Sequence, residues 1–454
     1  MEKAYESVIK KYKKNKLYIN VLSILKINVS MKHIFCFLFI ISIIACKEKP
    51  TSSPTTELNI AADNFEKDLQ SKLIDAVEGS VFILPEGKFD LKGGISLQDI
   101  PAITIKGSGK GKTILSFKGQ ISGAEGMLIK NVKNLTLEGF TVADSKGDAI
   151  KVQACTNVIM RDLETTWTGG KLPTNGAYGL YPVSCTGVLM EKCEASYAMD
   201  AGIYVGQSTN VIVRDNYAHN NVAGIEIENT ICGEVYNNIA KQNAGGMLIF
   251  DMPDLPQAKG DKIKFYNNLM EDNNGENFAP KGMVVSTIPS GSGMIIMAHR
   301  NIEMYKNTIK NNKSVGIAIN SWLLTGVPFK SKDYDPYYRN INIHDNEITG
   351  TIGPIDQQSD FGKLIHGVLQ GKPSDIIMDG LFSPELIDAQ GKVQGICISK
   401  NGNATFLCFN MYKGQKPEEI LKNMSKDISQ FDCTLEAFDT SCHSAWLSGD
   451  VTKK

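Results

Sequence analysis

One short phrase of the chain recurs at a nearly constant interval, and this repeat limits the folds open to it. The sequence GIYV at Gly202 returns 22 residues later as GIEI at Gly224. A period of 22 to 23 residues, with insertions between some copies, is typical of a solenoid in which each copy forms one turn. A small residue opens each copy: Gly126, Ala149, Gly179, Gly202, Gly224, Gly246, Gly282 and Gly316.

Alternating polar and apolar residues within each copy indicate strands. A second alternating stretch follows each opening stretch, with Met160, Met190, Val213 and Val235 in equivalent positions. A period of two is typical of strands and not of helices. Three short strands per turn therefore predict an all-β fold, a right-handed parallel β-helix with turns of about 22 to 23 residues.

A column of asparagines supports the stacking. Asparagine occupies one equivalent position in successive turns, where neighbouring backbones lie about 4.8 Å apart. We expect these side chains to bond to one another and to the backbone as a structural ladder. Its members are Asn216, Asn238, Asn268, Asn307 and Asn346.

Both ends of such a solenoid need covering. Apolar residues at near-helical spacing predict a cap helix over residues 63–78, and the β-helix with this cap spans residues 63–350. The helical face consists of Phe65, Leu69, Leu73, Ile74 and Val77. Residues 351–454 lose the period and are predicted to form an irregular β-containing cap, with a hairpin at Asn401-Gly402 and a helix at 417–426.

The N-terminal residues predict export. Met31-Lys32-His33 and the apolar run IFCFLFIISIIA form a signal sequence that is short for a membrane span. The run ends at Cys46 and resembles a bacterial lipobox, so residues 31–46 are expected to be a lipoprotein signal peptide with Cys46 as the lipidated residue. A plain secretory signal is the alternative. Residues 1–30 are expected to be an upstream extension and residues 47–62 a flexible tether. The signal peptide and Cys46 predict a protein of the bacterial cell envelope that is held to the membrane by its lipid anchor alone.

Charge argues against one class of partner. The chain has 48 basic and 49 acidic residues, and no basic stripe is evident along it. Nucleic-acid binding is therefore not expected, because it depends on clustered Lys and Arg that neutralise phosphates.

Polar residues alternate with the core positions of the opening strands and predict a functional strip on the flank of the solenoid. Aromatic and polar side chains in such a strip suit a polysaccharide. The strip contains Lys151, Tyr181, Tyr204 and Glu226, with Gln153 and Glu228 beside them and Asp148 and Asp200 just before their strands. A merely solvated surface would collect the same residue types.

The strip has the groups that uronate chemistry requires. Removing the proton beside a sugar carboxylate needs a charge neutraliser, a base and an acid. Lys151 could neutralise the carboxylate, Tyr204 could move the proton and Tyr181 could protonate the leaving oxygen. Glu226 with Glu228 or Asp200 could hold Ca²⁺, and no other cofactor is indicated. The paired carboxylates would also permit glycoside hydrolysis.

Four insertions are predicted to emerge as loops: 164–178, 251–262, 283–300 and 320–339. Their aromatic and charged residues could wall a cleft, since aromatic rings stack on sugars, or could pack on one another. The candidates are Trp167, Trp322, Tyr334, Tyr337, Tyr338, His299, Arg300 and Asp251.

The cysteines fit an oxidising compartment. Two of the ten, Cys36 and Cys46, fall in the expected signal, which leaves an even number for disulfides. Cys155 and Cys185 occupy equivalent positions in adjacent turns, so they are either a disulfide or two stacked thiols. Four cysteines near the C-terminus allow three pairings: Cys397, Cys408, Cys433 and Cys442.

The segments KTILSFKGQISGAEGMLI, AGIYVGQSTNVIVRDN, NNVAGIEIEN and GGMLIFDMPDLPQ resemble a family of exported parallel β-helix repeat proteins, over residues 80–350. That family has lipoprotein members and no assigned reaction. Its members are often encoded beside a diheme c-type cytochrome, so the resemblance implies a c-type cytochrome as a candidate partner.

More broadly, the chain resembles the pectate lyase-like superfamily, with its polygalacturonases and mannuronan C5-epimerases. It departs from them because it has YGLYPVS at 178–184 where the epimerases carry Asp-Pro-His-Asp, and it lacks the paired Asp signature of the polygalacturonases. Two functions remain: binding and modification of a polysaccharide, with uronate lyase- or epimerase-like chemistry, or a non-catalytic envelope scaffold.

Overall fold

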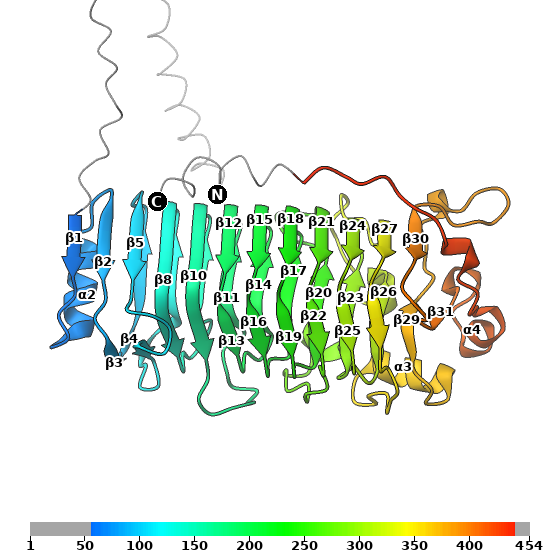
Figure 1. Cartoon of the computed structure of the whole chain (residues 1–454), viewed down its shortest axis with the longest axis horizontal. Coiled ribbons are helices and arrows are strands. Elements are labelled where there is room, and N and C mark those ends of the chain that lie inside the picture. The colour runs from blue at the N-terminus through cyan, green and yellow to red at the C-terminus, as the bar shows by residue number, and fades with distance from the viewer. Residues whose placement is uncertain (1–55, 441–454) are drawn as a thin grey trace, which may run out of the picture. The chain divides into compact units, whose positions relative to one another are not determined.

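A computed structural model describes residues 56–440, which stack into one solenoid of parallel strands (Figure 1). Residues 1–55 and 441–454 lie outside the described residues. The expected upstream extension, the signal peptide with Cys46, most of the tether and Cys442 are among them. Within residues 56–440, no helix combines the length and apolar character that a membrane crossing requires.

Each coil of the solenoid contains three short strands. In one coil these are β11 (Tyr178–Val183), β12 (Thr186–Glu191) and β13 (Glu194–Ser196), and β14 (Ala201–Gly206) then begins the next coil. All pairings between these strands and those of adjacent coils are parallel. The structure therefore confirms the predicted all-β parallel β-helix.

The strands form three faces. The first face contains β4 (Gly93–Gln98), β7 (Ser122–Lys130), β9 (Ile150–Gln153), β11, β14, β17 (Ala223–Glu228), β20 (Gly245–Phe250), β23 (Ser292–Met297), β26 (Val315–Asn320), β29 (Ser374–Met378) and β31 (Phe406–Cys408).

The second face contains β1 (Thr56–Asn59), β2 (Ser80–Ile83), β5 (Ile103–Lys106), β8 (Lys133–Ala143), β10 (Thr156–Thr166), β12, β15 (Thr209–Arg214), β18 (Ile231–Tyr236), β21 (Asp261–Tyr266), β24 (Arg300–Tyr305), β27 (Arg339–His344) and β30 (Ile396–Ser399). The third contains β3 (Gly87–Asp90), β6 (Thr113–Ser116), β13, β16 (Tyr217–His219), β19 (Ile239–Lys241), β22 (Leu269–Glu271), β25 (Thr308–Lys310) and β28 (Glu347–Thr349). The long strands β8 and β10 pair on both of these faces.

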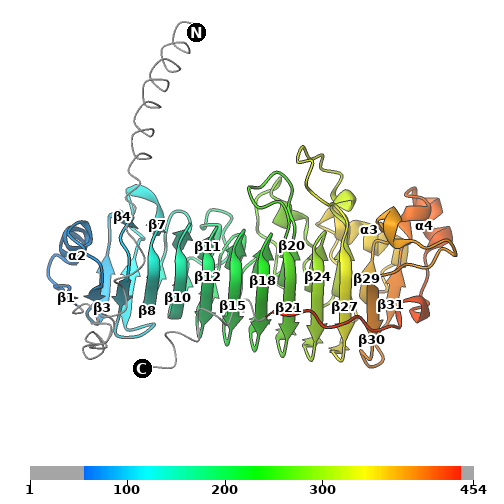
Figure 2. The ribbon, with the colours of Figure 1, turned by 90° about the horizontal axis from the view of Figure 1, so that it is seen from above.

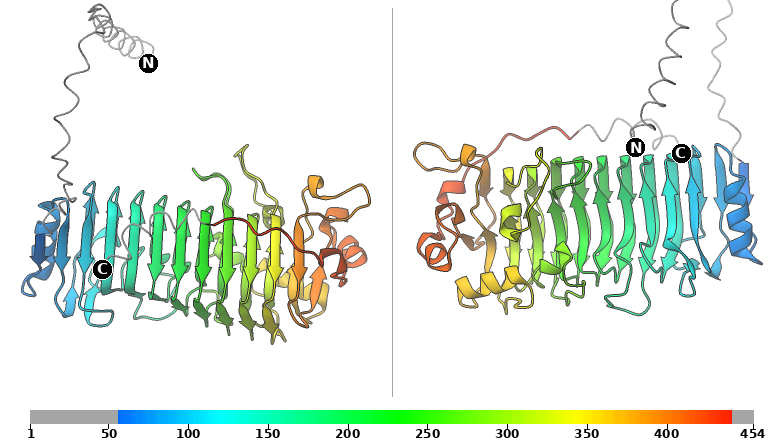
Figure 3. Two further views of the ribbon diagram at one scale, coloured as in Figure 1. Left: turned by 45° about the horizontal axis from the view of Figure 1, so that its top comes forward. Right: turned by 180° about the vertical axis from the view of Figure 1, so that it is seen from behind.

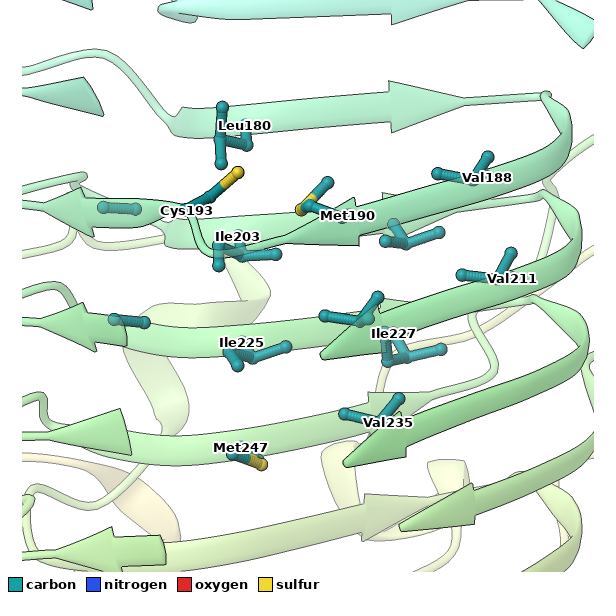
Figure 4. Close-up of a cluster of buried hydrophobic side chains, with 14 of the residues drawn as sticks. Leu180, Val188, Met190, Cys193, Ile203, Val211, Ile225, Ile227, Val235 and Met247 are labelled. Carbon is teal, nitrogen blue, oxygen red and sulfur yellow. The ribbon is translucent and has the colours of Figure 1, made fainter. Parts of the chain in front are cut away.

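The core lies inside the coils and follows the predicted alternation (Figure 4). On the first face, Ile203 pairs with Ile225 and Val205 with Ile227, and all four are buried. On the second face the four predicted positions are in register, with Met160, Met190, Val213 and Val235 following one another. Apolar side chains thus stack on their equivalents along the solenoid, which buries each coil against two neighbours.

Two asparagine ladders run along the solenoid. In the first, the side-chain amide of each asparagine donates to Oδ1 of the next, at 2.9 to 3.1 Å from Asn216 to Asn346. This ladder continues to Asn401. The second ladder joins Asn221, Asn243, Asn273 and Asn312 in the same way.

The N-terminal end is covered by a helix, shorter than predicted. Helix α2 (Phe65–Ile74) buries Phe65, Leu69 and Leu73. Ile74 and Val77, expected on the same apolar face, are exposed: Val77 lies beyond the end of the helix, and Ile74 is about 100° around the helix from the buried Leu73. Strand β1 lies in the expected tether and pairs with β2, so the ordered solenoid begins earlier than predicted.

The C-terminal region continues the solenoid where an irregular cap was expected. Strands β29 and β31 extend the first face and β30 extends the second. This region also contains helices α3 (Asp360–Leu369) and α4 (Pro417–Asn423) and the 3-10 helices η4 (Pro384–Leu386), η5 (Met411–Lys413) and η6 (Ser429–Phe431). Two further 3-10 helices, η2 (Val284–Thr287) and η3 (Trp322–Thr325), precede it. The predicted hairpin at Asn401-Gly402 is wrong: the strands on either side belong to different faces, and Asn401 ends the first ladder.

One repeat was placed at the wrong glycine. Strand β20 pairs with β23 so that Gly245 faces Ser292, which makes Gly293 the partner of Gly246. Gly282, the predicted repeat opener, lies before η2 in a loop. The insertion predicted at 283–300 therefore contains the strand β23, because the true insertion comes earlier in the coil.

A segment after the last coil returns along the second face. Cys433 forms a disulfide with Cys397 of β30, and residues 432–440 then run back across the neighbouring strands (Figure 2, red). Lys264 of β21 lies over the ring of Phe438, and Thr440 donates to Glu234 of β18 at 2.7 Å. We call residues 432–440 the return segment.

The structure decides between the alternatives for Cys155 and Cys185. Both are free, buried thiols, and each sulfur lies 3.4 Å from a backbone carbonyl of its own turn, so the stacked-thiol alternative is the one observed. Cys408 is also free, while Cys232, which lies outside the predicted C-terminal group, is disulfide-bonded.

Candidate functional site

The predicted strip lies on the outward side of the first face and its residues are in register. Lys151 pairs with Tyr181 on the next strand, and Tyr204 pairs with Glu226. Glu228 faces Gly206 one strand away. The parallel pairing therefore brings together side chains that are up to 77 residues apart in sequence, from Lys151 to Glu228.

Much of this outward side is covered, contrary to the expectation of an open flank. Tyr204, Glu226, Glu228 and Asp200 are only 3 to 6% exposed. A second apolar cluster, which includes Leu248 and contacts from the loops, lies outside the first face. The loops and α3 cover it from β14 toward β29 (Figures 2 and 3). The outward side is thus a second core over half of its length.

The residues that remain accessible form an outer group. The Lys151 ammonium lies 3.9 Å from Glu125 Oε1, 3.9 Å from Asp148 Oδ2 and 4.9 Å from the ring centre of Tyr181. The side chains of Lys151 and Asp148 are 22% and 15% exposed. Gln153 lies half-buried on the same strand as Lys151. This outer group holds a cation, two carboxylates and a phenol at the surface.

The buried residues form an inner group. Tyr204 Oη donates to Glu228 Oε1 at 2.6 Å, whereas Glu226 Oε2 is buried without a hydrogen-bond partner among the described residues. The Tyr204 ring lies across the backbone at Gly206, where a Cβ atom would collide with it. The glycine thus allows the phenol to turn along the face toward Glu228, while its ring still meets that of Tyr181 in the outer group, with 4.9 Å between the ring centres.

Tyr178 joins the two groups and was not singled out in the sequence. Its ring centre lies 4.5 Å from that of Tyr181 and 4.4 Å from that of Tyr204. A side-chain hydrogen bond to Tyr178 lowers the pKa of Asp200, against the larger effect of burial. Tyr178 is the first residue of β11, and its backbone N–H donates to the Asp148 carboxylate at 3.3 Å. Its position at the start of this strand, one strand from Asp148, is the sequence signal that could have identified it.

Burial changes the protonation of the whole cluster. It raises the pKa of Asp148 to about 6, and the nearby charge of Lys151 opposes the rise. Burial likewise raises the pKa values of Asp200 and Glu228 to about 7, and raises that of Glu226 further.

Burial also raises the pKa of each of the three tyrosines, so their phenols stay protonated at neutral pH. The cluster therefore contains carboxyl groups that can accept or release a proton near pH 7, which suits acid–base chemistry.

The residues do not form a calcium site. Among residues 56–440, no group of three or more His, Cys, Asp or Glu side chains is placed to hold a metal ion. Glu228 instead accepts from the Tyr204 hydroxyl, Asp200 bonds to Tyr178, and Glu226 is buried beside them. No step that uses Ca²⁺ is derived from them.

The loop aromatics pack and do not wall an open cleft. Trp167 belongs to the main core, with its indole N–H donating to Ser145 O at 2.8 Å. Trp322 is 2% exposed and meets Tyr334 edge to face. His299 and Asp251 are buried beside each other, with 3.6 Å between His299 Nε2 and Asp251 Oδ1. The packing alternative is therefore the one observed for these residues.

A cavity of about 180 Å³ lies farther along the same outward side. Its floor is formed by first-face residues and its walls by η2, η3 and α3. Phe250, which lines it, pairs with Glu228 of the inner group, so the cavity begins one strand from the cluster. Two of its three walls come from predicted insertions, since η2 lies in 283–300 and η3 in 320–339, whereas α3 lies outside the four insertions and was not predicted to contribute.

A family model described as a right handed beta helix region matches residues 168–325, in agreement with the predicted handedness. No curated protein sequence matches the chain. Among solved structures, the Azotobacter vinelandii mannuronan C-5 epimerase AlgE4 A-module is similar with 13% identity, a TM-score of 0.45, and coverage of 71% of this chain and 88% of that one.

Two further structures are similar. The alginate lyase from Paenibacillus sp. str. FPU-7 has 13% identity and a TM-score of 0.35 over 63% of this chain and 99% of its own. Pectate lyase Pel9A has 12% identity and a TM-score of 0.35 over 65% and 79%. At this level of similarity, the comparison carries no information about the reaction.

Proposed function

We propose that this protein binds an acidic polysaccharide along the accessible half of the first face and modifies it at the outer group by uronate chemistry. The observation that supports this most is the contact set of Lys151, Asp148 and Tyr181, which combines a cation, a carboxyl group and a phenol at the surface. These are the three functions that proton removal beside a sugar carboxylate requires.

In this proposal Lys151 binds the sugar carboxylate and stabilises the charge that develops when the neighbouring C–H bond breaks. Asp148 takes the proton, because its pKa of about 6 leaves it mostly ionised at neutral pH. Tyr181 donates its proton to the glycosidic oxygen as the C–O bond breaks and a C=C bond forms. Burial raises the pKa of Tyr181, which keeps it in the donating form.

The roles differ from those expected from sequence alone. Tyr204 was the expected base, but its hydroxyl donates to Glu228, and the residue is only 3% exposed. We therefore assign the role of base to Asp148. Tyr204 and Glu228 have a supporting role, because the Tyr204 ring packs against Tyr178 and Tyr181.

We also propose export to the bacterial envelope with a lipid anchor at Cys46. The disulfide between Cys397 and Cys433, together with the bonded Cys232, supports an oxidising compartment. A c-type cytochrome remains a candidate partner under the second function, a non-catalytic scaffold. The covered inner group favours that second function, because a buried strip offers little surface to a glycan.

The test incubates purified protein with polygalacturonate and alginate. It follows ultraviolet absorbance of unsaturated ends and, by NMR, the ratio of uronate epimers. Lys151→Gln, Asp148→Asn and Tyr181→Phe should each lower the rate by a factor on the order of 10² or more. Lys133→Gln, an exposed lysine of β8 on the second face, should leave it unchanged.

Binding measured separately on a glycan array distinguishes the two functions. Binding without product, unaffected by Asp148→Asn, would leave a glycan-binding scaffold. Neither binding nor product on either polymer would remove the polysaccharide proposal and favour the protein partner.

A further inference from the structure

We propose that the cavity between η2, η3 and α3 is a binding site for a small phenol or aryl alcohol, with its ring among apolar side chains and its hydroxyl donating to Asn320. This site is distinct from the outer group, and the inference does not rest on the proposed function.

The floor and walls of the cavity would surround a ring. Phe250 and Met297 lie next to each other on the floor, on adjacent strands, and Ile295 completes it. Leu324 comes from η3 and Phe361 from α3. Two aromatic rings and a methionine sulfur make favourable contacts with a further aromatic ring.

One polar group in this apolar setting is unsatisfied. Asn320 follows Phe250 and Met297 in the same column of the first face and lines the cavity. Its side chain is 5% exposed, and its Oδ1 atom has no hydrogen-bond partner among the described residues. A buried acceptor left without a donor costs about 1–3 kcal/mol. Because Oδ1 is itself buried, the Asn320 amide must turn toward the cavity, where a guest's hydroxyl would then supply the missing donor.

The size and the opening fit the same class of guest. The volume of about 180 Å³ is slightly larger than the ~150 Å³ of an engineered apolar cavity that binds benzene. Thr287 and Asp360 line the cavity and are exposed, so it reaches the surface between η2 and the start of α3. A single ring with one polar substituent can therefore enter and be enclosed.

The experiment compares phenol with toluene, which has the same ring and lacks the donor. Both are titrated into the purified protein by calorimetry, with ligand-observed NMR as a second readout. A purely apolar cavity prefers toluene, because burying an unpaired hydroxyl costs about 1–3 kcal/mol. We expect the wild-type protein to bind phenol at least as tightly as toluene. Asn320→Leu, which keeps the side-chain size, should reverse this order to a preference for toluene of about tenfold.

Filling the cavity provides the control for location. Leu324→Trp and Val284→Trp place an indole in the cavity from opposite walls and should abolish binding of both probes, and circular dichroism checks that each variant is folded. Leu323→Trp, at the exposed neighbouring position, should leave binding unchanged.

Two results would overturn the proposal. Absence of binding of either probe at millimolar concentration would mean that the cavity holds only water. Binding of phenol that persists in both filled variants would place the site elsewhere.

Discussion

Gly206 determines how the inner group is arranged. The Tyr204 ring crosses the backbone at this glycine and reaches Glu228 on the next strand. We expect Gly206→Ala to displace the ring, break that hydrogen bond and lower the free energy of unfolding by about 1–3 kcal/mol. Tyr204→Phe, which removes only the hydroxyl, should cost about 1–3 kcal/mol because Glu228 Oε1 loses its donor. Urea titrations would measure both, and an unchanged midpoint for Gly206→Ala would show that the ring has another position.

Glu228 should also make stability depend on pH. Burial raises its pKa from 4.5 to about 7, so between these values the folded protein holds a proton that the unfolded chain has released. Stability therefore falls as pH rises from about 4.5 to 7 and changes little above that. Glu228→Gln cannot ionise at this position, so we expect the free energy of unfolding of this variant to decrease less over the same pH range, by up to about 3 kcal/mol. Melting temperatures of both proteins between pH 4.5 and 8 test it; parallel curves would contradict it.

At the scale of the element, the asparagine ladder links successive coils through buried hydrogen bonds. Asn268 accepts from the backbone and side chain of Asn238 at 3.0 and 3.1 Å and donates to Asn307 and to Val235 O. We expect Asn268→Ala to remove these four buried hydrogen bonds, to leave the Asn238 backbone N–H without its partner, and to destabilise the protein by roughly 3 kcal/mol or more. Thr186→Ala, which removes an exposed hydrogen bond to Thr209 of the next coil, is the matched control and should cost under about 0.5 kcal/mol. Similar midpoints for the two variants would mean that the ladder adds little.

Features that depend on the regular stacking of coils could be predicted from the sequence, whereas features that depend on the insertions could not. The period, the inward positions such as Ile203 and the ladder could be predicted because they depend on the spacing of neighbouring coils, which is fixed. The exposure of Tyr204 and Glu226 could not, because it depends on where long insertions settle after the coils have formed. The misplaced Gly282 has the same origin: an insertion concealed one repeat.

For the whole molecule, the thiols should divide into two classes. Cys155, Cys185, Cys193 and Cys408 are free and buried, whereas Cys232, Cys397 and Cys433 are bonded. Alkylation after unfolding without reductant, followed by peptide mass mapping, should label the first class and leave the second unlabelled. If Cys155 and Cys185 remain unlabelled, they form the disulfide that the sequence allows.

The return segment changes how a stack of this kind can come apart. Coils of a solenoid hold only their neighbours, so an unconstrained stack frays from its ends, one coil after another. Here a disulfide joins the segment to β30, while Thr440 reaches back to β18. Loosening the last coils therefore also requires releasing contacts near the middle of the stack. The C-terminal third should exchange its amide hydrogens as one cooperative unit, and reduction of the disulfides should return it to gradual fraying.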